Sequence, residues 1–100
     1  MERKKKMTVT VRFIGALRNA SGKSKITMTI KNAVTLREII KKIVEEKPKL
    51  KRALIDPELE DPRPNALILV NEKEISVLNG LETMVKDGDE VVFVPVLHGG

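Results

Sequence analysis

Few residues in this chain of 100 could carry out side-chain chemistry, since it has no cysteine and a single histidine. These counts exclude a disulfide, a thiolate metal site, a cysteine nucleophile and a metal site built from several histidines. The candidate reactive group is the α-carboxylate of Gly100, which follows Gly99. Such a carboxylate is inert until it is activated, for example as an acyl-adenylate.

The two final glycines suit an activation of this kind. Glycine has no Cβ, so the carbonyl is unhindered and the backbone can thread a narrow channel. Once activated, the acyl group accepts sulfide to form a thiocarboxylate, or accepts a lysine amine to form an isopeptide bond. The chain would then be a carrier or a tag that needs no catalytic side chain and no metal. An ordinary solvated terminus is the alternative interpretation.

The elements that must position this tail begin with its own strand. Residues 90–96 are almost continuously apolar, which is typical of a central strand covered on both faces. Asp87-Gly88 predicts a tight turn before it. Alternating apolar residues predict two further strands at 7–14 and 25–30, joined as a hairpin through a loop that contains Gly15 and Gly22.

A helix is predicted from Thr35 onward. Thr35 and Glu38 have the spacing of a capping box, and Pro48 is expected to end the helix. Its apolar residues recur at helical spacing: Leu36, Ile39, Ile40, Ile43 and Val44.

The second half of the chain is less regular. Residues 49–63 predict a loop broken by prolines, in which Leu50, Leu54 and Ile55 could form a short turn of helix. Residues 66–70 predict a third strand, apolar on both faces. Ile75 and Val77 are expected in a short return strand. A single helical turn is expected to contain Leu81, Met84 and Val85.

This order of elements favours an α+β fold, the ubiquitin-like β-grasp. It has a mixed sheet of four to five strands, with the first and last strands parallel in the centre and one main amphipathic helix on one face. We expect a basic N-terminal extension at 1–6, the domain at 7–96 and an exposed tail at 97–100. No apolar run is long enough for a membrane span, and we expect a cytoplasmic protein.

The net charge of +5 raises nucleic-acid binding as another function. Recognition of single-stranded RNA usually needs aromatic platforms, and Phe13 and Phe93 both fall within predicted strands. A solvated basic surface is therefore favoured over direct nucleic-acid binding. The carboxylates of the proline-broken loop have no histidine near them in sequence, which argues against a metal or acid–base site: Asp56, Glu58, Glu60 and Asp61.

Several motifs resemble those of the MoaD/ThiS-type sulfur carriers and ubiquitin-related modifiers. Residues 66–71, 78–81 and 86–91 are similar to the MoaD family, the small subunit of molybdopterin synthase. The ending 97–100 is similar to the eukaryotic ubiquitin-related modifier that carries sulfur for tRNA thiolation, as is Arg63-Pro64 before the third strand.

The resemblance implies that Gly100 is adenylated by an E1-like adenylyltransferase, which uses ATP, and is then thiocarboxylated. The sulfur would go to a tRNA thiolase or to the large subunit of molybdopterin synthase, and the tail could also be joined to lysines of target proteins. The chain would bind no cofactor of its own. A dedicated MoaD-type subunit is the alternative, and a basic nucleic-acid-binding module is the third.

Other residues could assist these partners. Gly99, His98 and Leu97 would thread into the activating enzyme, although His98 could be an exposed residue without a role and Leu97 could extend the packing of the last strand. One helix cannot cover both faces of the sheet. A partner surface is therefore possible on the other face, unless the 49–63 loop covers it: Leu67, Leu69, Val92 and Val94.

Overall fold

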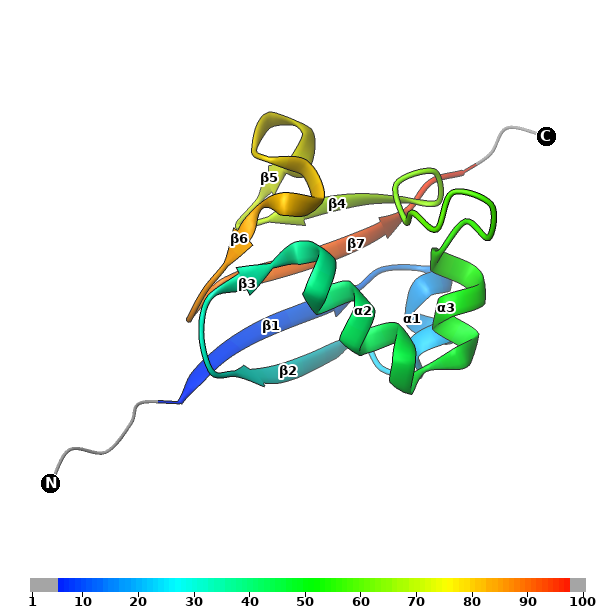
Figure 1. Cartoon of the computed structure of the whole chain (residues 1–100). Helices are drawn as coiled ribbons and strands as arrows, with labels where there is room; N and C mark the ends of the chain where they lie inside the picture. The colour runs from blue at the N-terminus through cyan, green and yellow to red at the C-terminus, as the bar shows by residue number, and fades with distance from the viewer. Residues whose placement is uncertain (1–5, 98–100) are drawn as a thin grey trace, which may run out of the picture.

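A computed structural model describes residues 6–97, and its main sheet has five strands in the order β2-β1-β7-β4-β5 (Figure 1). These strands are β1 (Met7–Phe13), β2 (Lys25–Ile30), β4 (Ala66–Val70), β5 (Lys73–Glu74) and β7 (Glu90–Pro95). A separate two-stranded sheet pairs β3 (Val34–Thr35) with β6 (Met84–Val85). The helices are α1 (Ala16–Ser21), α2 (Leu36–Glu46) and α3 (Pro48–Leu54), with 3₁₀ turns η1 (Ile75–Val77) and η2 (Gly80–Glu82).

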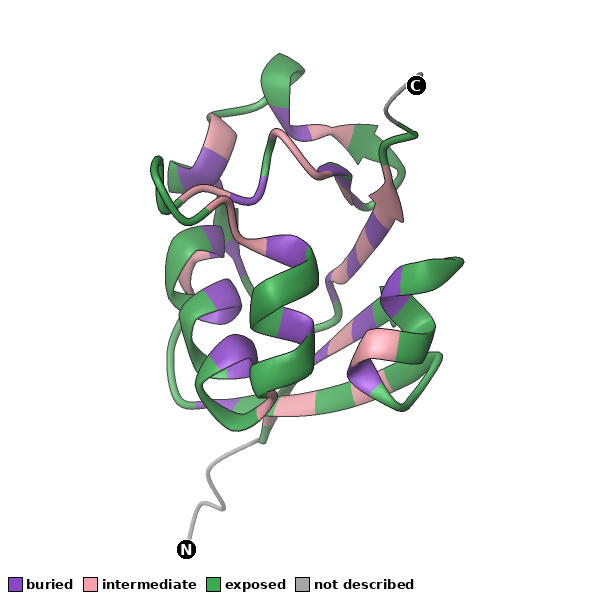
Figure 2. Cartoon of the chain, turned by 90° about the vertical axis from the view of Figure 1, so that its right-hand side faces the viewer, coloured by how far each residue is buried: buried purple, intermediate pink, exposed green. Residues whose placement is uncertain are grey.

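The predicted β-grasp arrangement is confirmed. β1 runs parallel to β7 in the centre of the sheet, while β2 and β4 are antiparallel to β1 and β7. Figure 1 shows α2 and α3 on the same face of this sheet. The core lies between these helices and the sheet. Buried and exposed positions therefore alternate along the strands and helices, as Figure 2 shows.

The main helix forms as its sequence predicts. The Thr35 hydroxyl accepts a hydrogen bond from the Glu38 backbone N–H at 3.3 Å, which satisfies one of the free donors of the first turn. All five of the predicted apolar residues of α2 are buried. The helix ends at Glu46, and Pro48 then occupies the start of α3, where its missing N–H costs nothing.

Several local expectations were wrong. The loop of the first hairpin contains α1, whose Leu17 is buried, and residues 49–63 begin within a helix rather than a loop. The return strand is β5, whereas Ile75 and Val77 form a 3₁₀ turn. Of the expected helical turn only Leu81 lies in one, because Met84 and Val85 pair with β3. β7 is central, but helices cover only one of its faces.

Candidate functional site: the end of the central strand and the open sheet face

The end of β7 carries the tail. β7 is hydrogen-bonded to β1 on one side and β4 on the other, and the Val96 N–H donates to the Asn65 carbonyl at 3.0 Å. One residue later, the side chain of Leu97 is 92% exposed. Leu97 therefore does not extend the packing of the last strand, and the chain leaves the domain directly from its central strand.

The remaining predicted tail residues, His98, Gly99 and Gly100, lie outside the described residues. The point of departure is fixed by backbone hydrogen bonds up to Val96, so the position of residue 97 relative to the sheet follows from the fold.

A glycine packs against the last residue of β7. Gly15 has φ +56° and ψ −132°, a conformation that side chains with a Cβ rarely adopt. A Cβ at this position would lie 3.2 Å from Cγ of Pro95. The turn from β1 into α1 thus packs closely against the strand end from which the tail departs.

The four residues predicted as a partner surface lie together on the sheet face opposite α2. The register pairs Leu67 with Val94 and Leu69 with Val92, which places all four side chains on one face. Leu67 is 41% exposed and the other three are half-buried. The alternative, cover by the 49–63 segment, is not favoured by the fold, since α3 lies on the helix face (Figure 1).

Two apolar residues of this surface were missed by the sequence reasoning. The Ile14 N–H donates to the Phe93 carbonyl at 3.0 Å, so the β1–β7 ladder continues and sets Ile14 beside Val94. Val96 continues the outward alternation of β7, and both residues are more than 40% exposed. Continuing the alternation of β1 by one residue would have found Ile14. We call the set the open-face patch: Ile14, Leu67, Leu69, Val92, Val94 and Val96.

A charged pair borders this patch. Arg12 Nε lies 2.6 Å from Glu90 Oε2 on the open face, next to Val92 in the β1–β7 register. Both side chains are substantially exposed, so the pair contributes little to stability. Its charges could orient a partner that covers the patch.

The other end of β7 is held by carboxylates. Asp89 is buried, and its two oxygens accept hydrogen bonds from the Asn71 side chain at 2.9 Å and the Lys86 N–H at 2.8 Å. Asp87 accepts from the Thr8 N–H at 2.8 Å, and Gly88 N–H donates to the Thr8 carbonyl. The Asp-Gly-Asp motif therefore fixes where β7 begins.

The carboxylates of residues 56–61 also have structural partners. One oxygen of Asp56 accepts from the N–H groups of Glu58 and Leu59, at 3.0 and 2.9 Å. Asp61 forms an ion pair with Arg63 at 2.6 Å, and this hydrogen-bonded guanidinium lowers the pKa of Asp61 and raises that of Arg63. Within residues 6–97, no cluster of three or more His, Asp or Glu side chains could hold a metal.

The aromatic residues do not form a nucleic-acid platform. Phe13 and Phe93 are buried and stack on each other, with ring centroids 5.6 Å apart. They are the only aromatic residues of the chain. The part of the chain that the structure describes also has no helix long and apolar enough to span a membrane.

A mixed sheet with parallel central strands, one crossing helix and a chain end that departs from the central strand defines a small ubiquitin-like β-grasp protein. Residues 11–100 match the profile of the ThiS family, and the chain belongs to this family. The homologues of this chain are small ubiquitin-like modifiers and sulfur carriers rather than enzymes.

Curated relatives agree with this assignment. Small archaeal modifier protein 3 of Haloferax volcanii is 27% identical over 94% of this chain and 100% of its own length. Ubiquitin-related modifier 1 of Schizosaccharomyces pombe is 47% identical over 38 residues, which are 38% of this chain and 39% of that protein. That stronger match thus spans well under half of the relative.

A solved structure has the same fold. The solution structure of small archaeal modifier protein 1 from Methanosarcina acetivorans has a TM-score of 0.78 and 26% identity, and it covers 97% of this chain and 100% of that one. The predicted resemblance to sulfur carriers and ubiquitin-related modifiers is therefore confirmed at the level of family and fold.

Proposed function

We propose that this protein is a ubiquitin-like sulfur carrier and protein modifier that reacts through the α-carboxylate of Gly100. A carboxylate oxygen attacks the α-phosphate of ATP in an E1-like enzyme, and pyrophosphate leaves. Sulfide, delivered by a sulfur donor, then attacks the acyl carbon, and AMP leaves with one former carboxylate oxygen. The product is a thiocarboxylate. ATP belongs to the activating enzyme, and this chain supplies only the carboxylate.

The observation that supports the proposal is that the chain leaves the domain directly from the end of its central strand, where Leu97 is exposed. The match to the ThiS family also continues to Gly100. A tail anchored in this way can enter the active site of another protein while the domain stays folded outside it. His98 and Gly99 would lie within the threaded segment. The acceptor we favour is a tRNA thiolase, because residues 97–100 are similar to the ubiquitin-related modifier.

Intact-mass measurement tests the chemistry. The purified chain is incubated with its cognate E1-like enzyme, ATP and a sulfur donor, and we expect one carboxyl oxygen to be replaced by sulfur. Omission of ATP should prevent the change. The activity of this enzyme preparation is confirmed with another carrier protein from the same cell. An unaltered mass of this chain under the same conditions would refute the proposal. A branched peptide on a target lysine would reveal conjugation as a second fate of the same acyl-adenylate.

A dedicated small subunit of molybdopterin synthase is the second candidate, favoured by the similarity of residues 66–71 and 86–91 to the MoaD family. It would form a stable complex with the synthase large subunit and deliver sulfur to the pterin precursor. Co-purification with that subunit, together with pterin sulfuration by the thiocarboxylated chain, would favour this candidate over the tRNA pathway.

The open-face patch is proposed as the surface that docks on the activating enzyme. Leu67 is its most exposed strand residue, so Leu67→Asp should lower kcat/KM for adenylation roughly tenfold without unfolding the protein. The matched control is Val77→Asp, because Val77 is 72% exposed and lies in η1, outside the patch. Equal activity of the two variants would remove the patch from the docking surface.

A further inference from the structure

The edge strand β2 offers a second interaction surface, away from the end of β7 and from the open-face patch. β2 ends the sheet, so within residues 6–97 no strand pairs with its outer edge. The Phe13 N–H donates to the Ser24 carbonyl at 2.9 Å, which sets the alternation of the β1–β2 ladder. The backbone groups of Lys25, Thr27 and Thr29 consequently point away from β1 and are free to bind another strand.

A groove runs beside this edge, between β2 and α2. Its volume is about 570 Å³, and its apolar floor consists of Ile26, Met28 and Ile43. Ile26 and Met28 are only partly buried, although they belong to the face that packs on the core. A strand added to β2 would project every second side chain into this groove and would complete their burial.

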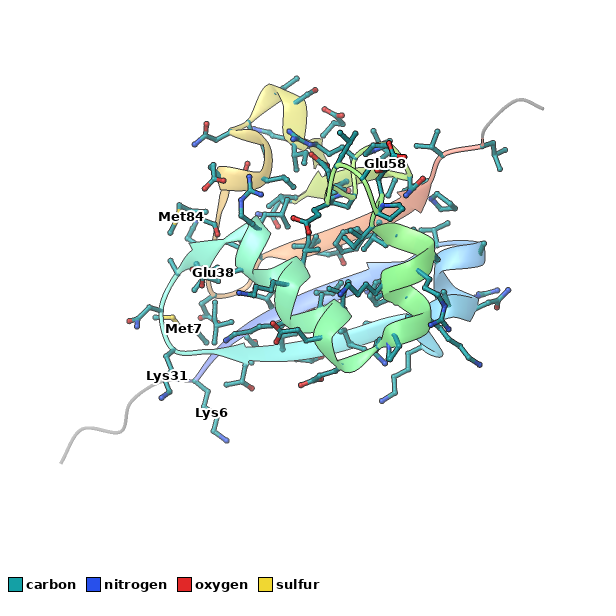
Figure 3. The ribbon with its side chains drawn as sticks, turned by 45° about the vertical axis from the view of Figure 1, so that its right-hand side comes forward. Lys6, Met7, Lys31, Glu38, Glu58 and Met84 are labelled. Carbon is teal, nitrogen blue, oxygen red and sulfur yellow. The ribbon has the colours of Figure 1, made fainter. Side chains whose placement is uncertain are left out.

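The charges around the groove determine which strand could bind. Lys23, Lys42 and Lys47 line it, opposed by Glu45 and Glu46 at the end of α2. Lys47 also borders an adjoining hollow lined by Lys49 and Arg52. Residues 47–54 carry four cations and no carboxylate, and Lys31 projects from the sheet at the opposite end of β2 (Figure 3). Cations therefore outnumber carboxylates among the residues that line the groove and the adjoining hollow.

A second copy of this chain is a poor occupant. Antiparallel pairing of two β2 strands centred on Thr27 would oppose Lys23 of one copy to Lys31 of the other, at both ends of the pair. Lysines on an edge strand are a common means of preventing such self-association. The same lysines attract a strand of opposite charge.

We propose that the β2–α2 groove binds an extended peptide segment of a partner protein, with alternating apolar residues flanked by acidic ones, as an added strand of the sheet. The occupied surface is separate from the end of β7 and from the open-face patch. A partner could therefore hold the carrier while the tail is in an active site. This inference does not depend on the tail chemistry, and its test uses none.

The probe is an acetylated synthetic peptide that alternates valine with threonine and has two aspartates at each end. Added to the isotope-labelled full chain, it should shift the amide signals of residues 25–30 and 42–47, with an affinity that falls as salt rises. A peptide with lysines in place of the aspartates should bind at least about tenfold more weakly. N-methylation of alternate residues, which removes the donors of one peptide edge, should abolish binding.

Protein variants locate the site. Lys42→Glu should weaken binding roughly threefold to tenfold, whereas Lys73→Glu, the same charge change on β5 at the other edge, should leave it unchanged. Thr27→Pro removes an outward donor without breaking the β1–β2 ladder and should also reduce binding. Absence of binding, shifts confined to the open-face patch, equal affinity for both peptides, or dimerisation through β2 would each overturn the proposal.

Discussion

The two ends of β7 are built in opposite ways. Where the strand begins, a buried carboxylate and its neighbours hold it to β4 and β1 through side-chain hydrogen bonds, as at Asp89 and Asp87. Where it ends, a backbone hydrogen bond from the Val96 N–H to the Asn65 carbonyl precedes an exposed Leu97. The difference indicates that stability is concentrated at the start of the strand and accessibility at its end.

The largest expected effect is on activation of the tail, and it should leave the stability of the domain unchanged. Deletion of Gly99 and Gly100 should abolish thiocarboxylate formation, because the new terminal His98 carries a Cβ and lies two residues too close to the domain. The midpoint of urea unfolding should remain that of the intact chain. A deletion variant that is still activated would show that the final glycines are dispensable and would contradict the proposed chemistry.

A substitution at the start of β7 should lower stability and leave activation of the tail unchanged. Asp89→Ala leaves the Asn71 side chain and the Lys86 N–H without their acceptor, and we expect a loss of about 2–3 kcal/mol in the free energy of unfolding. The yield of thiocarboxylate per folded molecule should be unchanged. Urea titration measures the first quantity and intact mass the second.

A matched substitution sharpens the result at Asp89. Asp89→Asn keeps one acceptor oxygen and should recover part of the lost stability. If Asp89→Ala instead impaired activation in fully folded protein, the assignment of this motif to structure alone would be wrong.

The sequence predicts those parts of the fold that have a clear period. β1, β2 and α2 were predicted because their apolar residues recur every second residue or at helical spacing, and β4 and β7 because they are short, continuous apolar runs. α1 has six residues and is too short to show a period. Pro48 was recognised as the end of one helix, but a proline is equally suited to begin one, and α3 was therefore anticipated only as a possible short turn within a loop.

The candidate site was predicted to a similar extent. The four original residues of the open-face patch followed from two strands that are apolar on both faces. The role of Asp87 and Asp89 did not follow, because their partners Thr8 and Asn71 are 79 and 18 residues away in sequence. Only the tertiary fold brings these donors to the carboxylates, whereas the sequence predicts no more than a tight turn.

Gly15 allows the end of β7 to be perturbed alone. Gly15→Ala should cost about 1–2 kcal/mol, since its backbone conformation disfavours a Cβ and that Cβ would press on Pro95. The amide signals of Val96 and Leu97 should move. Gly22→Ala is the control: Gly22 also has positive φ, but a Cβ there meets no atom within 4 Å, so destabilisation should leave these two signals in place.

The smallest expected effect concerns the segment that presents Asn65 to Val96. The pKa of Asp61 is lowered by its hydrogen bond to Arg63, so the ionised form is favoured in the folded state. The resulting stability is present above the ordinary pKa of 3.8 and is lost as the pH falls through the lower folded value. Because Arg63 is half-exposed, the contribution should be only about 0.2–1 kcal/mol.

Urea unfolding between neutral and acidic pH should show Asp61→Asn less stable than the native chain at neutral pH, with the difference shrinking below pH ~4. The Arg63 N–H can still donate to the oxygen of an asparagine at position 61, so the variant tests the charge alone. A difference that stays constant across this range would show that the charge of Asp61 is not its cause.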